Sequence, residues 1–290
     1  MPKNLTDELF EASPNRRSFL KKIGIATAAV GAISVAGATP AEAQTMTELT
    51  VLRFALNLEY LEAEFYTYAL FGSSITGFGI GIDGTANGAN PPSGGATTGG
   101  KQVNFSNNLV FTRDIADQIG ADERAHVALL RSALGAQKIA KPNINLNALG
   151  FGFDNQNDFL KLARIFEDIG VTAYAGAAGL LTTPSIITTA ARILAAEAEH
   201  VGTIRTQVAR LNIPTTPLDG ADLIPPPSGT RDHYLSINTS NGLVAVRTPG
   251  QVLYLAYGMM AGVTQGGFFP TGVNGELTTS SGPATAANLS

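Results

Sequence analysis

The chain has 290 residues, of which 44% are hydrophobic and 14% charged, and its formal net charge at pH 7 is −4. This composition supplies enough apolar side chains for a folded core and excludes an intrinsically disordered protein. The sequence has no Cys, which excludes disulfides, thiolate metal sites and a cysteine nucleophile, and its negative charge argues against a nucleic-acid partner. Any metal must therefore be bound through oxygen or nitrogen.

Residues 1–43 have the pattern of a targeting segment. The stretch "NRRSFLKK" is followed by a small-residue apolar run, Ile23 to Ala38, and by "AEA". It resembles a twin-arginine export signal in which Asn15 replaces the usual hydroxyl residue. We expect cleavage after Ala43 and a periplasmic location in a bacterium. The apolar run is short and rich in Ala and Gly for a membrane span, so membrane attachment is expected only if the leader is retained.

The first predicted helix covers Met46–Phe71, where apolar residues recur at helical spacing. Thr45 and Glu48 stand in the order of a capping box, and Gly72 is placed to end the helix. Residues 72–106 are rich in Gly, Pro, Asn and Thr, which predicts a long surface loop that buries little.

Three further long helices are predicted. They cover Asn107–Leu134, Asn157–Leu181 and a segment that starts with Thr183 as N-cap and Pro184 in the first turn and ends at Leu211. The tight joint near residue 182 makes the last two helices antiparallel neighbours, and residues 136–156 suffice to run back along a helix.

These elements predict an all-α protein. Residues 44–211 would form an antiparallel four-helix bundle with a long crossover between its second and third helices. Residues 212–290 are rich in Pro and Gly, and we expect a mostly irregular extension that packs on the bundle. Thr248, Pro249 and Gln251 predict one short, capped helix within it.

Two Glu-x-x-His motifs fall on the apolar stripes of the second and fourth helices, and they point inward. The first is Glu123 with His126, and the second is Glu197 with His200. A single such pair on a helix is more often a solvent-facing ion pair. The chain has 3 His, however, and two of them occupy matching inward positions. Glu64 and Glu199 fall off the stripes, and we expect both to be solvated.

Inward carboxylates need positive partners, because an unpaired buried charge costs several kcal/mol or becomes protonated. Lys and Arg are scarce on these stripes, so a metal ion is the expected partner. Carboxylate and imidazole without thiolate suit iron or manganese, and zinc is also compatible.

The first and third helices repeat a second pattern, an inward Glu followed seven residues later by Tyr. These pairs are Glu59 with Tyr66 and Glu167 with Tyr174. Glu62 lies on the same face as Glu59 and is the alternative ligand. Glu167 and the motif of the fourth helix are equally far from the joint at residue 182, so they meet at one level.

The region 46–211 resembles the ferritin-like superfamily of dinuclear carboxylate proteins, in which two helices each supply one Glu and the other two each supply a Glu-x-x-His motif. All six of these ligand positions are filled in this sequence. The resemblance implies two bound metals, Fe or Mn, with Glu123 and Glu197 bridging them. It further implies that Glu59 and Glu167 are terminal ligands and that each His binds one metal. Tyr66 and Tyr174 would donate hydrogen bonds to ligands. The six implied metal ligands are Glu59, Glu123, His126, Glu167, Glu197 and His200. The stretch "LEYLEAEFY" and the tail "GGFFPTGVNG" are similar to bacterial relatives of plant desiccation-associated proteins.

The resemblance implies a reaction with a small oxidant, hydrogen peroxide or dioxygen, in oxidative or desiccation stress protection. A catalase, an oxidase and a ferroxidase all remain open, and the alternative is a non-enzymatic structural protein of the cell envelope with or without metal. The long loop after the first helix and the lack of a short fifth helix argue against a twenty-four-subunit storage cage. A smaller homo-oligomer is compatible with the sequence. Solvent access to the metals distinguishes an enzyme from a structural protein, because an enzyme needs an open coordination position and a structural site does not.

Overall fold

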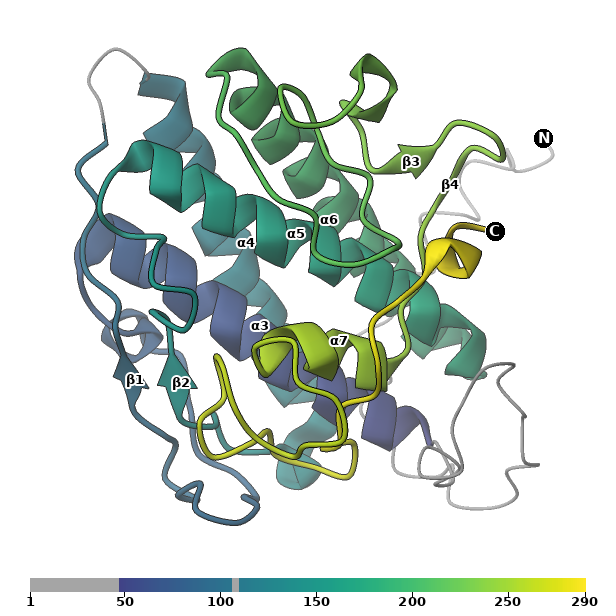
Figure 1. Cartoon of the computed structure of the whole chain (residues 1–290). Helices are drawn as coiled ribbons and strands as arrows, with labels where there is room; N and C mark the ends of the chain where they lie inside the picture. Colours follow the sequence, from purple (N-terminus) through teal and green to yellow (C-terminus); the bar gives the residue numbers. More distant parts are fainter. Residues whose placement is uncertain (1–46, 106–109) are drawn as a thin grey trace, which may run out of the picture.

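Four long helices form the centre of the computed structural model, which describes residues 47–105 and 110–290. They are α3 (Glu48–Phe71), α4 (Val110–Leu134), α5 (Gln156–Ala177) and α6 (Pro184–Arg210). Helix α3 packs along α4 and α5 packs along α6, and the two pairs enclose one shared core (Figure 1). The predicted all-α bundle is confirmed. The predicted leader, 1–43, and the predicted first turn of the second helix, 107–109, lie outside the described residues.

Helix α3 is bounded by two local signals. The Thr47 hydroxyl accepts a hydrogen bond from the Thr50 amide at 3.2 Å, which satisfies one of the free amides of the first turn. The N-cap is therefore Thr47 and not Thr45, which lies outside the described residues. At the other end Gly72 has φ +66°, a left-handed conformation that favours glycine, and it ends the helix as predicted.

The joint between α5 and α6 is built differently from its prediction. Helix α5 ends at Ala177 and continues as a 3-10 turn, Ala178–Leu180, because Leu181 already has extended backbone. Thr183 is the N-cap of α6, but its side chain does not cap the helix. Instead Glu48 of α3 accepts hydrogen bonds from the amides of Thr182 and Thr183 at 2.6 Å each. A carboxylate at a helix N-terminus is favourable because of the helix dipole.

The segment between α3 and α4 is a long, mostly exposed loop that is tied to the α4–α5 connection. It contains a 3-10 turn, Ile75–Phe78, and strand β1 (Thr97–Thr98), which pairs in parallel with β2 (Ile144–Asn145) of the α4–α5 connection. That connection begins with a 3-10 turn, Gly135–Gln137. Within the first segment the side chains of Ile75, Asn90 and Val103 are buried. Most of the segment is exposed, as predicted, and these few buried side chains lie where it packs against the α4–α5 connection and the tail.

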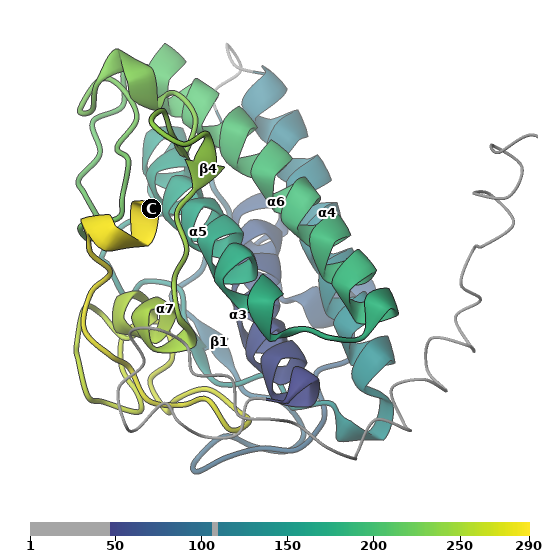
Figure 2. The ribbon, with the colours of Figure 1, turned by 90° about the vertical axis from the view of Figure 1, so that its right-hand side faces the viewer.

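The C-terminal extension is mostly irregular, as predicted, with one short helix. Its elements are a 3-10 turn (Arg231–His233), the antiparallel pair β3 (Ile237–Asn238) and β4 (Leu243–Val244), helix α7 (Pro249–Ala256) and a final 3-10 turn (Ala286–Leu289). The predicted capping box of α7 is present, with both reciprocal hydrogen bonds between Thr248 and Gln251. Figure 2 shows α7 on the α3 and α5 side of the bundle, away from α4 and α6.

A buried ion pair and a buried hydrogen bond fix this extension to the bundle. Arg164 of α5 contacts Asp222 of the extension, and Arg247 of the extension contacts Asp219 at 2.7 Å and donates to the Thr172 hydroxyl of α5 at 2.8 Å. These side chains are nearly inaccessible to solvent, so removing one partner of an ion pair would leave an uncompensated buried charge. The extension is therefore part of the folded unit.

None of the helices within residues 47–105 and 110–290 combines the length and apolar character that crossing a membrane requires.

Candidate metal centre

The six predicted ligands meet in the middle of the bundle, one or two from each helix. Glu59 comes from α3 and Glu167 from α5, and the two Glu-x-x-His motifs come from α4 and α6. All four carboxylates are completely buried, and the imidazoles are 6% and 8% exposed. Helical spacing explains this, because residues three apart on one helix share a face.

The ligands form two overlapping groups whose potential ligand atoms lie within 4.8 Å of one another. One group contains Glu59 and His126, and the other contains Glu167 and His200. Glu123 and Glu197 belong to both groups. The arrangement therefore has two centres that share two carboxylates.

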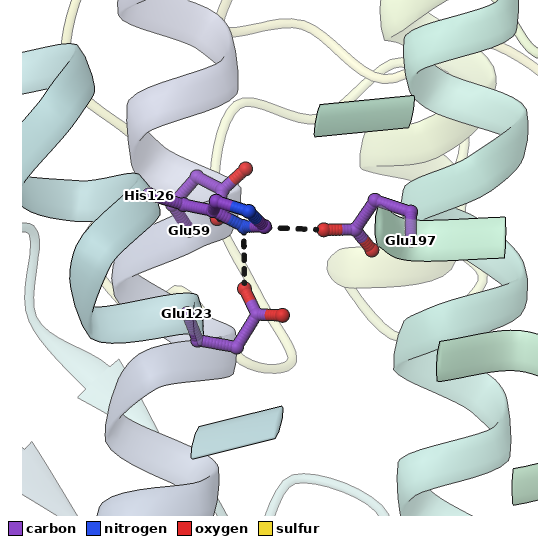
Figure 3. Close-up of side chains that lie close together, drawn as sticks. All are labelled: Glu59, Glu123, His126 and Glu197. Carbon is purple, nitrogen blue, oxygen red and sulfur yellow. Dashed lines mark ion pairs between the residues drawn. The ribbon is translucent and has the colours of Figure 1, made fainter. Parts of the chain in front are cut away.

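Each imidazole directs its Nδ1 atom at these carboxylates. His126 Nδ1 lies 3.3 Å from Glu59 Oε2 and 3.5 Å from both Glu123 Oε2 and Glu197 Oε1 (Figure 3). His200 Nδ1 lies 3.1 Å from Glu123 Oε1 and 3.2 Å from Glu167 Oε2. The ring centroids are 6.3 Å apart. Among the described residues, these four carboxylates form ion pairs with the two imidazoles alone.

The facing atoms have no hydrogen-bond partners within the part of the chain that the structure describes. Both oxygens of Glu123 and Glu197 are in this condition; so are Glu59 Oε2, Glu167 Oε2, His126 Nδ1 and His200 Nδ1. Buried polar atoms in native proteins are nearly always satisfied, and each exception needs an explanation such as a bound ion. The donor set of carboxylate and imidazole nitrogen suits iron, manganese or zinc. The residues therefore fit a dinuclear metal centre.

Burial raises the pKa of two of these four acids, Glu123 and Glu197. Burial, together with the charge of Glu59, raises the pKa of Glu123 to about 7. Burial and the charge of Glu123 hold the pKa of Glu197 well above its usual range. Burial alone lowers the pKa of His200, but the nearby carboxylates of Glu123 and Glu167 outweigh it and raise this pKa to about 12. The centre thus attracts positive charge, whether as protons or as metal ions.

The two tyrosines cross between the helices. Tyr66 of α3 donates to Glu167 of α5, and Tyr174 of α5 donates to Glu59 of α3. Each bond uses the carboxylate oxygen that does not face the centre. Burial and the adjacent carboxylate hold both tyrosine pKa values well above 10, so the phenols stay protonated donors. The sequence pairs each Tyr with the Glu of its own helix, whereas the hydrogen bonds join opposite helices.

Glu62, the alternative to Glu59, belongs to neither group of ligand atoms. It is 5% exposed and lies beside the centre, since a Cβ built on Gly170 would be 3.3 Å from Glu62 Oε1 and 2.6 Å from Glu197 Oε2. Burial and the charge of Glu197 hold its pKa well above its usual range.

Sequence reasoning missed the partner of His200. The outer nitrogen, Nε2, lies 3.4 Å from Asp122 Oδ2 of α4. Such a contact orients an imidazole toward a metal. Asp122 directly precedes Glu123, and the corresponding position before Glu197 is Ala196. Aligning the two Glu-x-x-His motifs and comparing their neighbours could have found this asymmetry.

Sequence reasoning also missed a buried ion pair between the bundle and the α4–α5 connection. Glu64 is completely buried and lies 3.3 Å from the Nζ atom of Lys141, which is itself 1% exposed. The prediction that Glu64 is solvated is wrong because the α3–α4 segment and the α4–α5 connection cover this side of α3. Glu199 is exposed, as predicted.

The comparisons with known proteins agree with this geometry. A family model described as a ferritin-like domain matches residues 47–210, which contain all six candidate ligands. The desiccation-related protein PCC13-62 of Craterostigma plantagineum is 30% identical over 175 residues, which cover 54% of this chain and 52% of that protein. The chain thus spans about half the length of this relative. No solved structure matches.

Proposed function

Because the chain belongs to the ferritin-like domain family, we propose that it binds two iron or two manganese ions and reacts with dioxygen or hydrogen peroxide. The observation that carries the proposal is the set of unsatisfied carboxylate and imidazole atoms that face one another at the core of the bundle. A pair of redox-active metals supplies the electrons for reduction of the oxidant, which carboxylate and imidazole side chains alone cannot do.

The overlap of the two ligand groups suggests the role of each residue. Glu123 and Glu197 belong to both groups and would bridge the metals. Glu59 with His126 would hold one metal, and Glu167 with His200 would hold the other. The bonds from Tyr66 and Tyr174 leave one carboxylate oxygen of Glu167 and of Glu59 directed at the centre.

The physiological role that we propose is protection against oxidative or desiccation stress. Its support is the relative described as desiccation-related, together with a centre suited to consuming oxidants. We also propose that the chain is exported through its leader, on the sequence pattern given above.

Oxidant consumption by the metal-loaded chain tests this function. The full-length chain is stripped with chelator, reloaded with iron or with manganese under anaerobic conditions, and mixed with dioxygen or with hydrogen peroxide. An oxygen electrode measures dioxygen uptake or release, and the absorbance of peroxide reports its loss. We expect consumption by the loaded chain and none by a double variant, Glu123→Ala with His126→Ala.

Glu199→Gln is the matched control because it removes an exposed acid from α6 directly beside His200. It should retain both metal and activity. If the loaded wild type binds two metals but consumes neither oxidant, the chain is a metal-binding structural protein and the proposed function is wrong.

A further inference from the structure

An apolar pocket lies beside the candidate metal centre and reaches Glu62 and Gly170, which are next to Glu197. It lies between α3, α5 and α7, where the extension covers the bundle. Met259, whose side chain is 45% exposed, lies in its wall, and so does the buried Glu62. The pocket therefore extends from the surface to the acid that lies beside Glu197.

Glycine at position 170 opens the inner end of this pocket. Gly170 lines the pocket, and a Cβ at this position would lie 2.6 Å from Glu197 Oε2, closer than atoms can approach. Any other residue would place a side chain between the pocket and this carboxylate. The absence of a side chain leaves Glu197 next to the pocket wall.

The internal repeat shows that this opening is one-sided. The separation that relates Glu59 to Glu167 and Tyr66 to Tyr174 also relates Glu62 to Gly170. At these corresponding positions α3 therefore has an acid, Glu62, and α5 has a residue without a side chain, Gly170. Packing in a regular helix interior does not call for glycine, which costs about 0.5–1 kcal/mol there relative to alanine.

The size and polarity of the pocket restrict what it can hold. Its cavity volume is about 40 Å³. A single water needs at least about 10–15 Å³ and two to four polar partners, whereas apolar cavities stay dry and bind apolar molecules such as xenon. Glu62 is the one polar side chain in the lining, and the rest are apolar or glycine. A diatomic apolar molecule fits, whereas hydrogen peroxide would lose most of its hydrogen bonds to water, with Glu62 as the one side chain of the lining that could replace any.

A second apolar pocket of the bundle provides a comparison. It lies between α3, α5, α6 and the segment that contains Arg247, and Ala177 and Tyr174 are in its wall. The Tyr174 hydroxyl donates to Glu59, so the tyrosine occupies the position between this pocket and the centre. In the first pocket the lining residue next to Glu197 is Gly170, which has no side chain, and the carboxyl of Glu62 lies beside it.

We propose that the pocket between α3, α5 and α7 is the route by which dioxygen reaches the metal centre, with Gly170 as its inner opening. This inference rests on the proposed function and narrows its oxidant to dioxygen. The route involves binding and passage of the gas and no change in its bonds.

Filling either pocket by the same change tests the route. Ala256→Leu adds side-chain volume to the first pocket from α7, outside the ligand-bearing helices, and Ala177→Leu adds the same volume to the second. The full chain is loaded with ferrous iron, and its oxidation by dioxygen and by hydrogen peroxide is followed by stopped-flow absorbance. Metal content and thermal unfolding are measured for both variants to show that the fold and centre are intact.

We expect Ala256→Leu to slow oxidation by dioxygen about tenfold, an added barrier of about 1.4 kcal/mol, and to leave the peroxide rate near that of the wild type. Ala177→Leu should change neither rate. Unchanged dioxygen rates in Ala256→Leu, or an equal loss in Ala177→Leu, would overturn the route. Equal slowing of both oxidants in Ala256→Leu would overturn its selectivity for dioxygen.

Xenon binding tests the pocket without metal or activity. Crystals of the metal-free chain pressurised with xenon should show a xenon atom between Glu62 and Ala256 in the wild type and none there in Ala256→Leu. An unoccupied pocket in the wild type would contradict the route. Xenon in the pocket of a chain that reacts with neither oxidant would instead show that the proposed function has failed and that the pocket has another role.

Discussion

The α3–α4 half and the α5–α6 half of the bundle carry the same ligands on different surroundings. Each half contributes a Glu, a Tyr bound to the Glu of the other half, and a Glu-x-x-His motif. A hydrogen bond near the candidate ligands is also repeated. Arg131 donates to the Tyr60 hydroxyl in the first half, and at the corresponding positions of the second half Arg205 donates to Asp168. The candidate ligands all lie in the repeated part. The differences between the halves therefore indicate where access to the candidate site and the orientation of its imidazoles differ.

Three differences stand out. α3 has Glu62 where α5 has Gly170, and α4 has Asp122 where α6 has Ala196. The connections also differ, because residues 72–109 join α3 to α4, whereas a 3-10 turn and three residues join α5 to α6. The sequence repeat thus encodes a symmetric ligand set inside an asymmetric protein.

The largest expected effect comes from removing a shared acid. Glu123→Ala should abolish binding of both metals, whereas His126→Ala, confined to one ligand group, should leave about one of the two. Elemental mass spectrometry after reloading measures this ratio. Equal losses in the two variants would mean that Glu123 is not shared between the centres.

Gly170→Ala should come next, because its Cβ would lie 2.6 Å from Glu197 Oε2 and displace that carboxylate. We expect reduced metal content and a lower melting temperature. Gly202→Ala is the matched control on α6, since its Cβ would meet only a Leu235 methyl at 3.8 Å. The control should stabilise the helix by about 0.5–1 kcal/mol. Normal metal content in Gly170→Ala would show that Glu197 is free to move.

Asp122→Asn sharpens the difference between the two histidines. The substitution removes the negative charge 3.4 Å from His200 Nε2. It should reduce the affinity of the His200 site for its metal by about tenfold and leave the His126 site unchanged. Competition with a metal-binding dye measures the two affinities. Asp117→Asn removes an exposed acid from the same helix and serves as the control. A loss spread equally over both sites would show that Asp122 acts through general electrostatics.

The smallest expected effect concerns the short α5–α6 joint. Glu48→Gln should cost about 1 kcal/mol at pH 7, since it weakens the hydrogen bonds to the first amides of α6. Burial raises the Glu48 pKa, but the bonds from Thr183 and Thr182 outweigh it and hold the pKa below 4.5. The carboxylate therefore stabilises the fold above pH 4.5, and its contribution is lost as pH falls through the lowered pKa.

Urea unfolding of the metal-free chain at pH 7 and pH 3 measures this effect. The difference between wild type and Glu48→Gln should be present at pH 7 and shrink at pH 3. A difference that is the same at both pH values would mean that the charge of Glu48 does not act at the joint.

The bundle and the clustering of the candidate ligands were predictable because helical spacing places residues on faces. The paired Glu-x-x-His motifs, the Glu and Tyr pairs, and the caps at Gly72 and Thr248 are all local signals. The family match to residues 47–210 agrees with the predicted ferritin-like fold.

Contacts between distant segments were not predictable in this way. Glu64 is buried because residues near 141 return over α3, and Glu48 caps a helix more than a hundred residues away. The crossing of Tyr66 to Glu167 likewise depends on how α3 and α5 pack and not on spacing along either helix. Such contacts are set by tertiary packing, which a single sequence does not display.

The metal content of the chain tests the dinuclear centre most directly. The chain is purified without chelator, and elemental mass spectrometry counts metals in the wild type, in Glu199→Gln and in Glu123→Ala with His126→Ala. We predict about two iron or manganese ions per chain in the wild type and the Glu199→Gln control, and a near-complete loss in the double variant. Low metal content that is the same in all three, and that reloading does not raise, would contradict a metal centre in this bundle.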